Sequence, residues 1–438
     1  MGMSKYLPWL LLFTCASAQA VPDIRHWQSD RGAGVYFVET RELPMVDIQV
    51  IFAAGSSRDG NSPGLAKLTN SLLAEGAGGL SADAISRGFE DLGAVYGFDA
   101  GRDSATVSLR SLSDPELLKP ALENFRRVIT APDFPEDAFR RQRDRALTAI
   151  REKQQSPDDL ASDAFYAALY GEHPYAFPSE GTEDSLQNIS RSDVATFHGR
   201  FYTARNAVIA IVGDLDRDDA AALVNELLAD LPPGEKAPPL PDVPRLAGAK
   251  TIMVDHPSTQ THILVGQPGI RRGDPDFFPL LVGNHVLGGG GMVSLLFREI
   301  REKRGLSYSA YSYFLPMFRP GPFVAGLQTR TDQAEAAVEL LHDQLQSYLE
   351  RGPAEAELMA AKKNISGGFP LRIDSNSDIV ANLALIGFYN LPLDYLETYV
   401  RNVEEVTADQ VREAFRRHLF LDRLVTVLVG PQTRGERH

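Results

Sequence analysis

The feature that most constrains the fold of this chain is an internal duplication. Residues 194–214 (VATFHGRFYTARNAVIAIVGD) resemble residues 411–431 (VREAFRRHLFLDRLVTVLVGP) in having an amphipathic helix, a turn and an apolar strand that ends at glycine. Upstream, both copies share a glycine followed three positions later by a tyrosine: Gly93 and Tyr96 in the first copy, Gly305 and Tyr308 in the second. Because order and spacing agree, we predict one folding unit that occurs twice.

A proline-rich segment separates the two copies. Residues 231–250 (LPPGEKAPPLPDVPRLAGAK) contain no periodic apolar pattern, which predicts an extended linker. On each side lies a stretch of about two hundred residues, the size of one domain. We therefore expect two domains, residues 21–230 and residues 251–438.

Each copy alternates apolar strands with amphipathic helices. Strand patterns include 47–54 (DIQVIFAA) and 206–213 (NAVIAIVG), and helical patterns include 115–130 (PELLKPALENFRRVIT) and 334–350 (AEAAVELLHDQLQSYLE). The chain of 438 residues is too long for one compact core. We predict an α+β fold in which each copy packs its helices against one mainly antiparallel sheet.

The first twenty residues, 1–20, have the features of a secretory signal peptide. Lys5 precedes a short apolar run, and the sequence AQA (18–20) is a small-residue cleavage pattern. The run is shorter than the ~20 residues that span a bilayer, so we expect export to a bacterial periplasm without a membrane span. Cys15, the only cysteine, lies in this segment, and a lipoprotein anchor at Cys15 is the alternative.

The charge balance argues against one class of partner. The chain has 44 Lys and Arg residues, 58 Asp and Glu residues, and a formal net charge of −14. Binding to a nucleic-acid backbone requires a positive footprint. We therefore expect no nucleic-acid partner.

Four stretches together resemble the pitrilysin-like metallopeptidases, the family of insulin-degrading enzyme and mitochondrial processing peptidase. They are AAGSSRD…GLA (53–66), HPYAFPSEGTEDSL (173–186), FYTARNAVIAIVGDLD (201–216) and LGGGGMVSLLFREIREKRGLSYSAYS (287–312). The likeness covers essentially the whole mature chain. It implies two α+β domains in each subunit, and two such subunits that close around a peptide chamber.

The helix after GLA differs from active family members at every zinc position. In those members, His-x-x-Glu-His places two histidines on one helical face for Zn²⁺, and its glutamate activates the bound water. The corresponding residues here are Lys67, Asn70 and Ser71, and the downstream glutamate that completes the site falls on Ala149. A lysine with a pKa near ~10.4 is a cation, and asparagine cannot act as a general base. We expect no catalytic zinc in this chain.

No other zinc motif replaces the lost one. The nine histidines include no i, i+4 pair: His26, His173, His198, His256, His262, His285, His342, His418 and His438. We expect structural roles for them, and we expect zinc in a partner chain.

The resemblance also implies a role for Arg301 and Tyr308. In paired members of the family, the non-zinc subunit supplies an Arg and a Tyr, seven residues apart, that face the partner's zinc. Both side chains can donate hydrogen bonds to a peptide carbonyl or to the oxyanion formed on it. We expect the helix 293–304 to end at Gly305, which would bring the two side chains together. The first copy has Phe89 in place of Arg301, so the fold does not require the arginine. The alternative is a solvated basic helix face with Tyr308 in the core.

The glycine run Gly288, Gly289, Gly290 and Gly291 lacks the Gly-Lys-Ser/Thr ending of a phosphate loop. It resembles a shorter form of the glycine-rich loop in the non-catalytic subunit of mitochondrial processing peptidase, which implies contact with the peptide. A flexible helix–helix connection is the alternative. Residues 97–109 occupy the place of the substrate-holding edge strand of active members, and the sequence leaves open whether they bind peptide.

These features together predict the non-catalytic subunit of an exported heterodimeric zinc metalloendopeptidase, inactive alone. The partner would be a homologous chain with His-x-x-Glu-His, and the substrates would be short unfolded peptides, because a closed chamber excludes folded proteins. The alternative is a structural or peptide-binding protein of the peptidase fold with no role in proteolysis.

Overall fold

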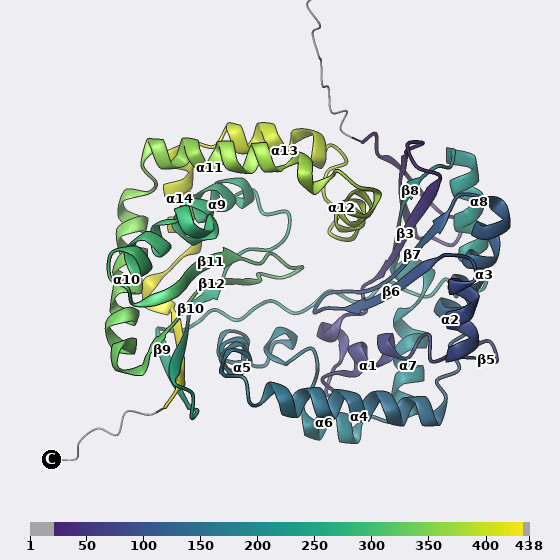
Figure 1. Cartoon of the computed structure of the whole chain (residues 1–438), viewed down its shortest axis with the longest axis horizontal. Coiled ribbons are helices and arrows are strands. Elements are labelled where there is room, and N and C mark those ends of the chain that lie inside the picture. Colours follow the sequence, from purple (N-terminus) through teal and green to yellow (C-terminus); the bar gives the residue numbers. More distant parts are fainter. Residues whose placement is uncertain (1–21, 432–438) are drawn as a thin grey trace, which may run out of the picture.

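The computed structural model describes residues 22–431 as two α+β units that lie side by side (Figure 1). The predicted signal peptide, with Cys15, lies outside the described residues, so cleavage and export stay predictions. Within the described range, no helix has the length and apolar character needed to cross a membrane. The segment predicted as a linker, 231–250, contains no helix or strand before Lys250, where the first strand of the second unit begins.

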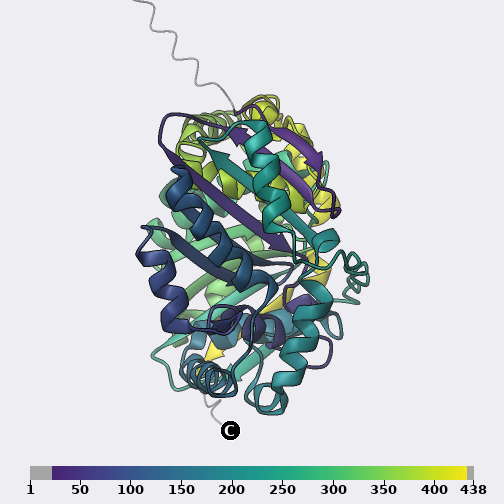
Figure 2. The same ribbon diagram turned by 90° about the vertical axis from the view of Figure 1, so that its right-hand side faces the viewer.

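The first unit is a six-stranded sheet with helices over its outer face (Figure 2). The strand order is β1-β2-β8-β3-β7-β6, and all neighbours are antiparallel except β2 and β8. The strands are β1 (Arg25–Gln28), β2 (Gly34–Glu39), β3 (Met45–Phe52), β6 (Val95–Ala100), β7 (Ala105–Leu112) and β8 (Ala207–Gly213), and a separate ribbon is formed by β4 (Gly76–Ala77) and β5 (Leu80–Ser81). The helices are α1 (Leu65–Ser71), α2 (Ala82–Glu90), α3 (Pro115–Thr130), α4 (Glu136–Lys153), α5 (Pro157–Tyr170), α6 (Glu183–Asn188), α7 (Arg191–Phe201) and α8 (Arg217–Leu227).

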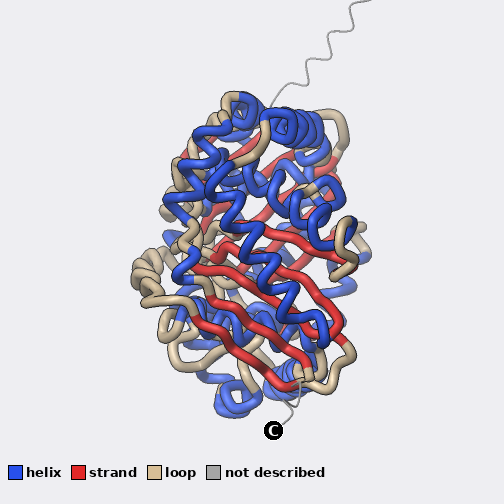
Figure 3. Tube along the Cα trace, turned by 90° about the vertical axis from the view of Figure 1, so that its left-hand side faces the viewer, coloured by secondary structure: helices blue, strands red, loops and turns tan. Residues whose placement is uncertain are grey.

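The second unit repeats this topology in a five-stranded sheet with order β9-β13-β10-β12-β11 (Figure 3). The strands are β9 (Lys250–Asp255), β10 (Gln260–Pro268), β11 (Ser307–Phe314), β12 (Pro322–Arg330) and β13 (Val425–Gly430). The helices are α9 (Phe277–Asn284), α10 (Ala334–Arg351), α11 (Glu355–Gly368), α12 (Asn376–Phe388), α13 (Tyr395–Glu404) and α14 (Ala408–His418), with π-helical turns η4 (His285–Gly289) and η6 (Phe297–Glu302). Its one parallel pair, β9 and β13, corresponds to β2 and β8. The predicted duplicated α+β fold is confirmed.

Local sequence explains where the helices begin. The predicted helix 115–130 has the same bounds as α3, and the carboxylate of Asp114 caps it by accepting a hydrogen bond from the N–H of Glu116 at 2.9 Å. Ser190 and Asp193 form a reciprocal capping box at the start of α7. Such caps satisfy backbone donors that the first helical turn leaves free.

One helix of each unit packs on the sheet of the other unit (Figure 1). α12 of the second unit covers β2, β3 and β8, where Tyr36 shares a core with Val380. α5 of the first unit covers β10 and β13, where Phe165 shares a core with Val427. The central strands are apolar on both faces, and the helices of their own unit cover one face only. The expectation that each copy packs its helices on its own sheet was therefore incomplete.

A buried carboxylate joins the two units. Asp103, in the β6–β7 turn, accepts hydrogen bonds from the hydroxyls of Tyr175 (2.5 Å) and Tyr389 (3.0 Å) and from the N–H of Phe318 (2.7 Å). His173 is buried beside it, and its Nδ1 accepts a hydrogen bond from the Tyr175 N–H at 3.1 Å. The HPYAFP segment of the sequence is thus part of the junction between the units.

Candidate functional site

Helix α1 carries three of the four positions that the resemblance assigns to a zinc site. The helix starts after Gly64, and the buried carboxylate of Asp59 accepts hydrogen bonds from the N–H groups of Gly64 (2.8 Å) and Ala66 (2.7 Å). Burial raises the pKa of the Asp59 carboxyl to about 8, and the hydrogen bonds from these N–H groups offset part of that rise. The helix on which active members carry the zinc motif is therefore formed in this chain.

Lys67, at the first histidine position, belongs to an ion network. Its Nζ lies 2.8 Å from Glu180, and Lys153 Nζ lies 3.6 Å from Glu180 and 2.9 Å from Asp163. Burial alone would raise the pKa of Glu180, but the hydrogen bond and charge of Lys67, with the charge of Lys153, lower this pKa to about 2. An ion pair thus occupies the position at which the resemblance places the first metal ligand.

The remaining motif positions are equally unsuited to zinc. Asn70 is buried, and its Nδ2 donates a hydrogen bond to the hydroxyl of Tyr202 at 3.2 Å. Ser71 Oγ donates to the carbonyl of Leu68 at 2.9 Å, and Ala149 lies exposed on α4 with no donor atom in its side chain. Zn²⁺ in proteins takes thiolate, imidazole or carboxylate ligands, and these four positions offer none. The residues present do not fit a zinc ion.

Among residues 22–431, one group of acidic and histidine side chains has metal-ligand spacing, and it lies elsewhere. Asp274 and Asp276 at the start of α9 face His418 at the end of α14. Asp276 already accepts two hydrogen bonds from the Arg417 guanidinium, both at 2.8 Å, and contacts His418 Nε2 at 2.9 Å. We interpret the group as an ion-pair cluster that ties α9 to α14.

The structure brings Arg301 and Tyr308 together. The Arg301 guanidinium lies 4.4 Å from the ring centre of Tyr308 and 4.7 Å from that of Phe297. Gly305, with φ of 62°, ends the turn in the left-handed region, where its N–H donates to the carbonyl of Arg301 and the Leu306 N–H donates to the carbonyl of Ile300. The single helix predicted over 293–304 is instead a short 3₁₀ turn followed by the π-helical turn η6. π-Helical turns are frequent at functional sites.

The surroundings of Arg301 bear on the choice between a site for another molecule and a solvated basic helix face with Tyr308 in the core. Three neighbouring basic residues have carboxylate partners: Arg298 pairs with Glu357, and Lys303 and Arg304 pair with Glu299. Arg301 has no such partner among the described residues, and Tyr308 is 76% exposed rather than in the core. The placement matches the expected pair, while its catalytic role stays a prediction.

The glycine run has a packing role and also lines a cavity. A Cβ atom on Gly288 would lie 2.4 Å from the backbone nitrogen of Ser312, so this position requires glycine. Gly288, Gly289 and Gly291 line a cavity of about 400 Å³ together with Asn284 and His285. Gly288 and Gly289 close the π-helical turn η4 and Gly291 begins the next turn, and the run borders a space that a ligand can enter.

The strands β6 and β11 form corresponding edges of the two sheets, and each has a sheet neighbour on one side only. β6 has β7 as its sheet neighbour, and β11 has β12. On the first sheet, Gly97, Asp99 and Ser108 line a hollow of about 360 Å³. Residues 97–109 thus include an edge strand, as the resemblance implies, and peptide binding by it stays open.

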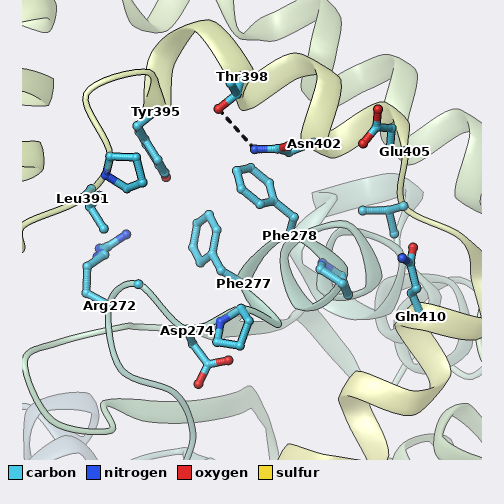
Figure 4. A pocket seen from close by; sticks show the side chains of 15 residues that line it. Arg272, Asp274, Phe277, Phe278, Leu391, Tyr395, Thr398, Asn402, Glu405 and Gln410 are labelled. Carbon is cyan, nitrogen blue, oxygen red and sulfur yellow. Dashed lines mark hydrogen bonds between the residues drawn. The ribbon is translucent and has the colours of Figure 1, made fainter.

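One pocket is lined by residues that belong to none of the sequence motifs described above (Figure 4). It has a volume of about 380 Å³ and an aromatic wall of Phe277, Phe278 and Tyr395 between α9 and α13. Asn402 donates a hydrogen bond to Thr398 at its rim. Adjacent phenylalanines at a helix start are common in cores, so the sequence alone gives no reason to place a pocket there.

Comparison with known proteins groups these features in one family. The description "Insulinase (Peptidase family M16)" matches residues 35–183, and "Peptidase M16 inactive domain" matches residues 188–365. The chain is 26% identical to the Non-peptidase homolog YmxG of Helicobacter pylori over 98% of this chain and 99% of that protein. It is 23% identical to the uncharacterized zinc protease YmxG of Bacillus subtilis over 93% of this chain and 98% of that protein.

Solved structures agree with this grouping. The crystal structure of a peptidase M16 inactive domain from Pseudomonas fluorescens matches with a TM-score of 0.91 and 44% identity, covering 94% of this chain and 99% of that one. A protease from Helicobacter pylori has the same fold, with a TM-score of 0.86 at 21% identity. The matched relatives include proteins described as proteases and others described as inactive. The chain belongs to peptidase family M16, the pitrilysin and insulinase family.

Proposed function

We propose that this chain is the non-catalytic subunit of an exported heterodimeric zinc metallopeptidase. The observation that carries the proposal is the Arg301–Tyr308 pair, in which the guanidinium has no carboxylate partner among the described residues and the phenol is exposed. An unpaired Arg beside an exposed aromatic ring is suited to bind a group from another molecule. The ion network at Lys67 supports the second half of the proposal, that the zinc belongs to the partner.

The chemistry assigned to the pair is hydrogen-bond donation. A zinc ion held by the partner would supply the attacking water, and negative charge would then develop on the oxygen of the peptide carbonyl. The Tyr308 O–H and the Arg301 N–H groups donate to that oxygen, which lowers the energy of the transition state more than that of the bound substrate. Cation–π contact with Arg301 positions the Tyr308 ring for this contact.

Peptide binding in the chamber would use the open sheet edges and the glycine-lined cavity. A peptide in extended form can add a strand to β6 or β11, with its backbone N–H and C=O groups paired to the edge. The cavity beside Gly288, Gly289 and Gly291 would accept a side chain of that peptide. Both features require an unfolded peptide, because a folded protein does not expose its backbone in this form.

A second candidate is a structural or peptide-binding protein with no role in proteolysis. The name of the relative from Helicobacter pylori, Non-peptidase homolog, favours it. So does the Lys67–Glu180 pair, which occupies the position of a metal ligand. In this case the open edges would still bind peptide, but Arg301 and Tyr308 would act as binding residues only.

Activity on mixing separates the two candidates. The chain is expressed together with a homologous chain that carries His-x-x-Glu-His and is encoded beside it, and each is assayed alone and mixed on unfolded peptides. We expect hydrolysis only in the mixture, reaching a plateau at equal amounts of the two chains. A zinc chain that is fully active alone, with no change on addition of this chain, would contradict the proposal and favour the second candidate.

A further inference from the structure

A fourth cavity lies where the two units meet the linker, and Arg301 and Tyr308 are not among the residues that line it. Its volume is about 810 Å³. It is lined by the ends of β1 and β2, by the linker residues 236–240, and by residues of the second unit around Phe318 and Phe388. A ligand in this cavity would therefore touch both units and the segment that joins them.

The charged side chains in the lining of this junction cavity are all basic: Arg58, Arg205, Lys236 and Arg319. The other titratable groups in the lining are His26 and Tyr36, and no Asp or Glu lines it. This is unexpected in a chain with a formal net charge of −14. Cations that share one cavity repel each other, and a bound anion would relieve that repulsion.

The four arginine and lysine side chains differ in whether the protein provides a carboxylate near them. Arg319 pairs with the exposed carboxylate of Asp242 at 2.9 Å. The charge of Arg58 is partly offset by the nearby Asp103, but its Nε is buried without a hydrogen-bond partner. Arg205 and Lys236 form no ion pair with any residue of the described range. The described residues thus provide no carboxylate partner for two of the basic side chains of this cavity.

Hydrogen bonds fix the backbone segments that carry these cations. Arg205 follows the start of a short 3₁₀ turn, and its N–H donates to the carbonyl of Pro233 at 2.9 Å. Asn206 accepts a hydrogen bond from the N–H of Ala237 at 2.9 Å, which fixes the linker next to Lys236. Arg58 donates to the carbonyl of Pro238 at 2.5 Å. Cations placed before binding lose little entropy when the anion arrives.

Aromatic rings complete the lining. The exposed ring of His26 stacks on Tyr36 with centres 4.4 Å apart and an angle of 25°. Phe318 and Phe388 pack together with centres 4.6 Å apart. The planar base of a nucleotide can stack on such rings while its phosphate chain contacts the basic side chains. The basic side chains can also bind a phosphate chain that carries no base.

We infer that the junction cavity binds a compact anion with several adjacent phosphate groups, either free oligophosphate or the phosphate chain of a nucleotide. Arginine and lysine are the usual protein partners of phosphate. The net charge of the chain argues against a long polyanion such as nucleic acid, but a compact anion senses only the local basic surface. Because Arg205, Lys236 and Arg319 come from the first unit, the linker and the second unit, the anion links all three.

Calorimetric titration of the full chain with sodium triphosphate and with ATP, at constant ionic strength, tests this inference. The variant is Arg205→Ala/Lys236→Ala, and the matched control is Arg145→Ala/Lys119→Ala, two exposed cations on other elements without ion-pair partners in the described residues. We expect saturable 1:1 binding by the wild type and the control, and affinity at least about 10-fold weaker in the variant. All four side chains lie at the surface or in the open cavity, and circular dichroism verifies folding.

The two ligands distinguish the source of the phosphate. Equal affinity for triphosphate and ATP means recognition of the phosphate chain alone. Tighter ATP binding, with the difference removed by His26→Ala, means that the base stacks on the aromatic lining. Absence of saturable binding of either ligand, or an equal loss in the variant and the control, would overturn the inference.

Discussion

Equivalent turns occur in both units, and the residue four positions before the glycine differs in kind, being aromatic in the first unit and cationic in the second. In the first unit, Phe89 is buried and its ring packs on Tyr96, with centres 4.3 Å apart. In the second unit, Arg301 packs on Tyr308 at 4.4 Å. The glycines between them, Gly93 and Gly305, have φ of 63° and 62°.

This comparison shows what the fold requires and what it does not. Both turns need a flat neighbour for the tyrosine, and an apolar ring fulfils that need in the first unit. Arginine fulfils it in the second unit at the cost of partial desolvation of a charge without a carboxylate partner in the described chain. An arginine that packing does not demand points to a role outside the fold.

The largest expected effect comes from placing the charge in the first copy. Phe89 is 1% exposed, so Phe89→Arg buries a guanidinium among apolar groups. We expect the free energy of unfolding, measured by urea denaturation, to fall by about 3–5 kcal/mol. The control Phe89→Leu should lose about 1–2 kcal/mol. Wild-type stability of Phe89→Arg would show that the first unit tolerates an arginine beside Tyr96, and would contradict the claim that this position requires an apolar ring.

The reverse exchange, Arg301→Phe, gives the second copy the residue of the first. Tyr308 keeps a flat neighbour, so we expect the unfolding free energy to change by no more than about 0.5 kcal/mol. Turnover by the mixed subunits should fall about 10²-fold, because a donor to the oxyanion is lost. Arg304→Phe, on the same turn, is the matched control and should retain turnover. If Arg301→Phe retained the same turnover as Arg304→Phe, Arg301 would have a packing role only.

A smaller effect is expected at the junction of the units. Asp103→Ala leaves Tyr175, Tyr389 and the Phe318 N–H without their shared acceptor. We expect a loss of about 1–3 kcal/mol in the unfolding free energy. The exposed Asp99 on the neighbouring strand is the control, and Asp99→Ala should change little. Equal stability of the two variants would show that the units do not depend on this contact.

The smallest effect is expected at the lost zinc position. The pKa of Glu180 is about 2 in the folded chain, below its ordinary value of 4.5, so the pair with Lys67 stabilises the fold above that value and is lost as the pH falls toward 2. Both side chains are more than a third exposed. Lys67→Met should therefore lower the unfolding free energy by at most about 1 kcal/mol at pH 7. The difference from wild type should shrink as the pH is lowered through about 4. A difference that does not depend on pH would argue against the ion pair, and Lys119→Met serves as the control.

Patterns within one stretch of the sequence were good guides to the fold. The helix 115–130 was predicted with the bounds of α3, and the glycine cap at Gly305 was expected from its spacing. The duplication led to the correct fold class, because equal order of elements implies equal sheet topology. The end of the turn before Gly305 was right, but the π-helical geometry of η6 was not foreseen, since periodicity does not distinguish it from an α-helix.

Features that depend on distant contacts were missed. Apolar spacing shows that α5 and α12 each have a buried face, but it does not say which sheet covers that face. The partner of Lys67 is Glu180, far along the chain, and nothing near Lys67 marks it. The exposure of Tyr308 agrees with the position that the family resemblance implies, whereas the strand pattern alone left a core position open. The basic junction cavity is assembled from segments that are individually unremarkable.

The most direct test of the account compares two tyrosines that hold equivalent places in the two units. Tyr308→Phe and Tyr96→Phe each remove one hydroxyl, and turnover is measured for each variant mixed at saturation with the zinc-bearing partner. The account predicts that Tyr308→Phe lowers turnover about 10²-fold while Tyr96→Phe leaves it unchanged. Wild-type turnover with Tyr308→Phe would contradict the claim that this chain contributes to the partner's active site.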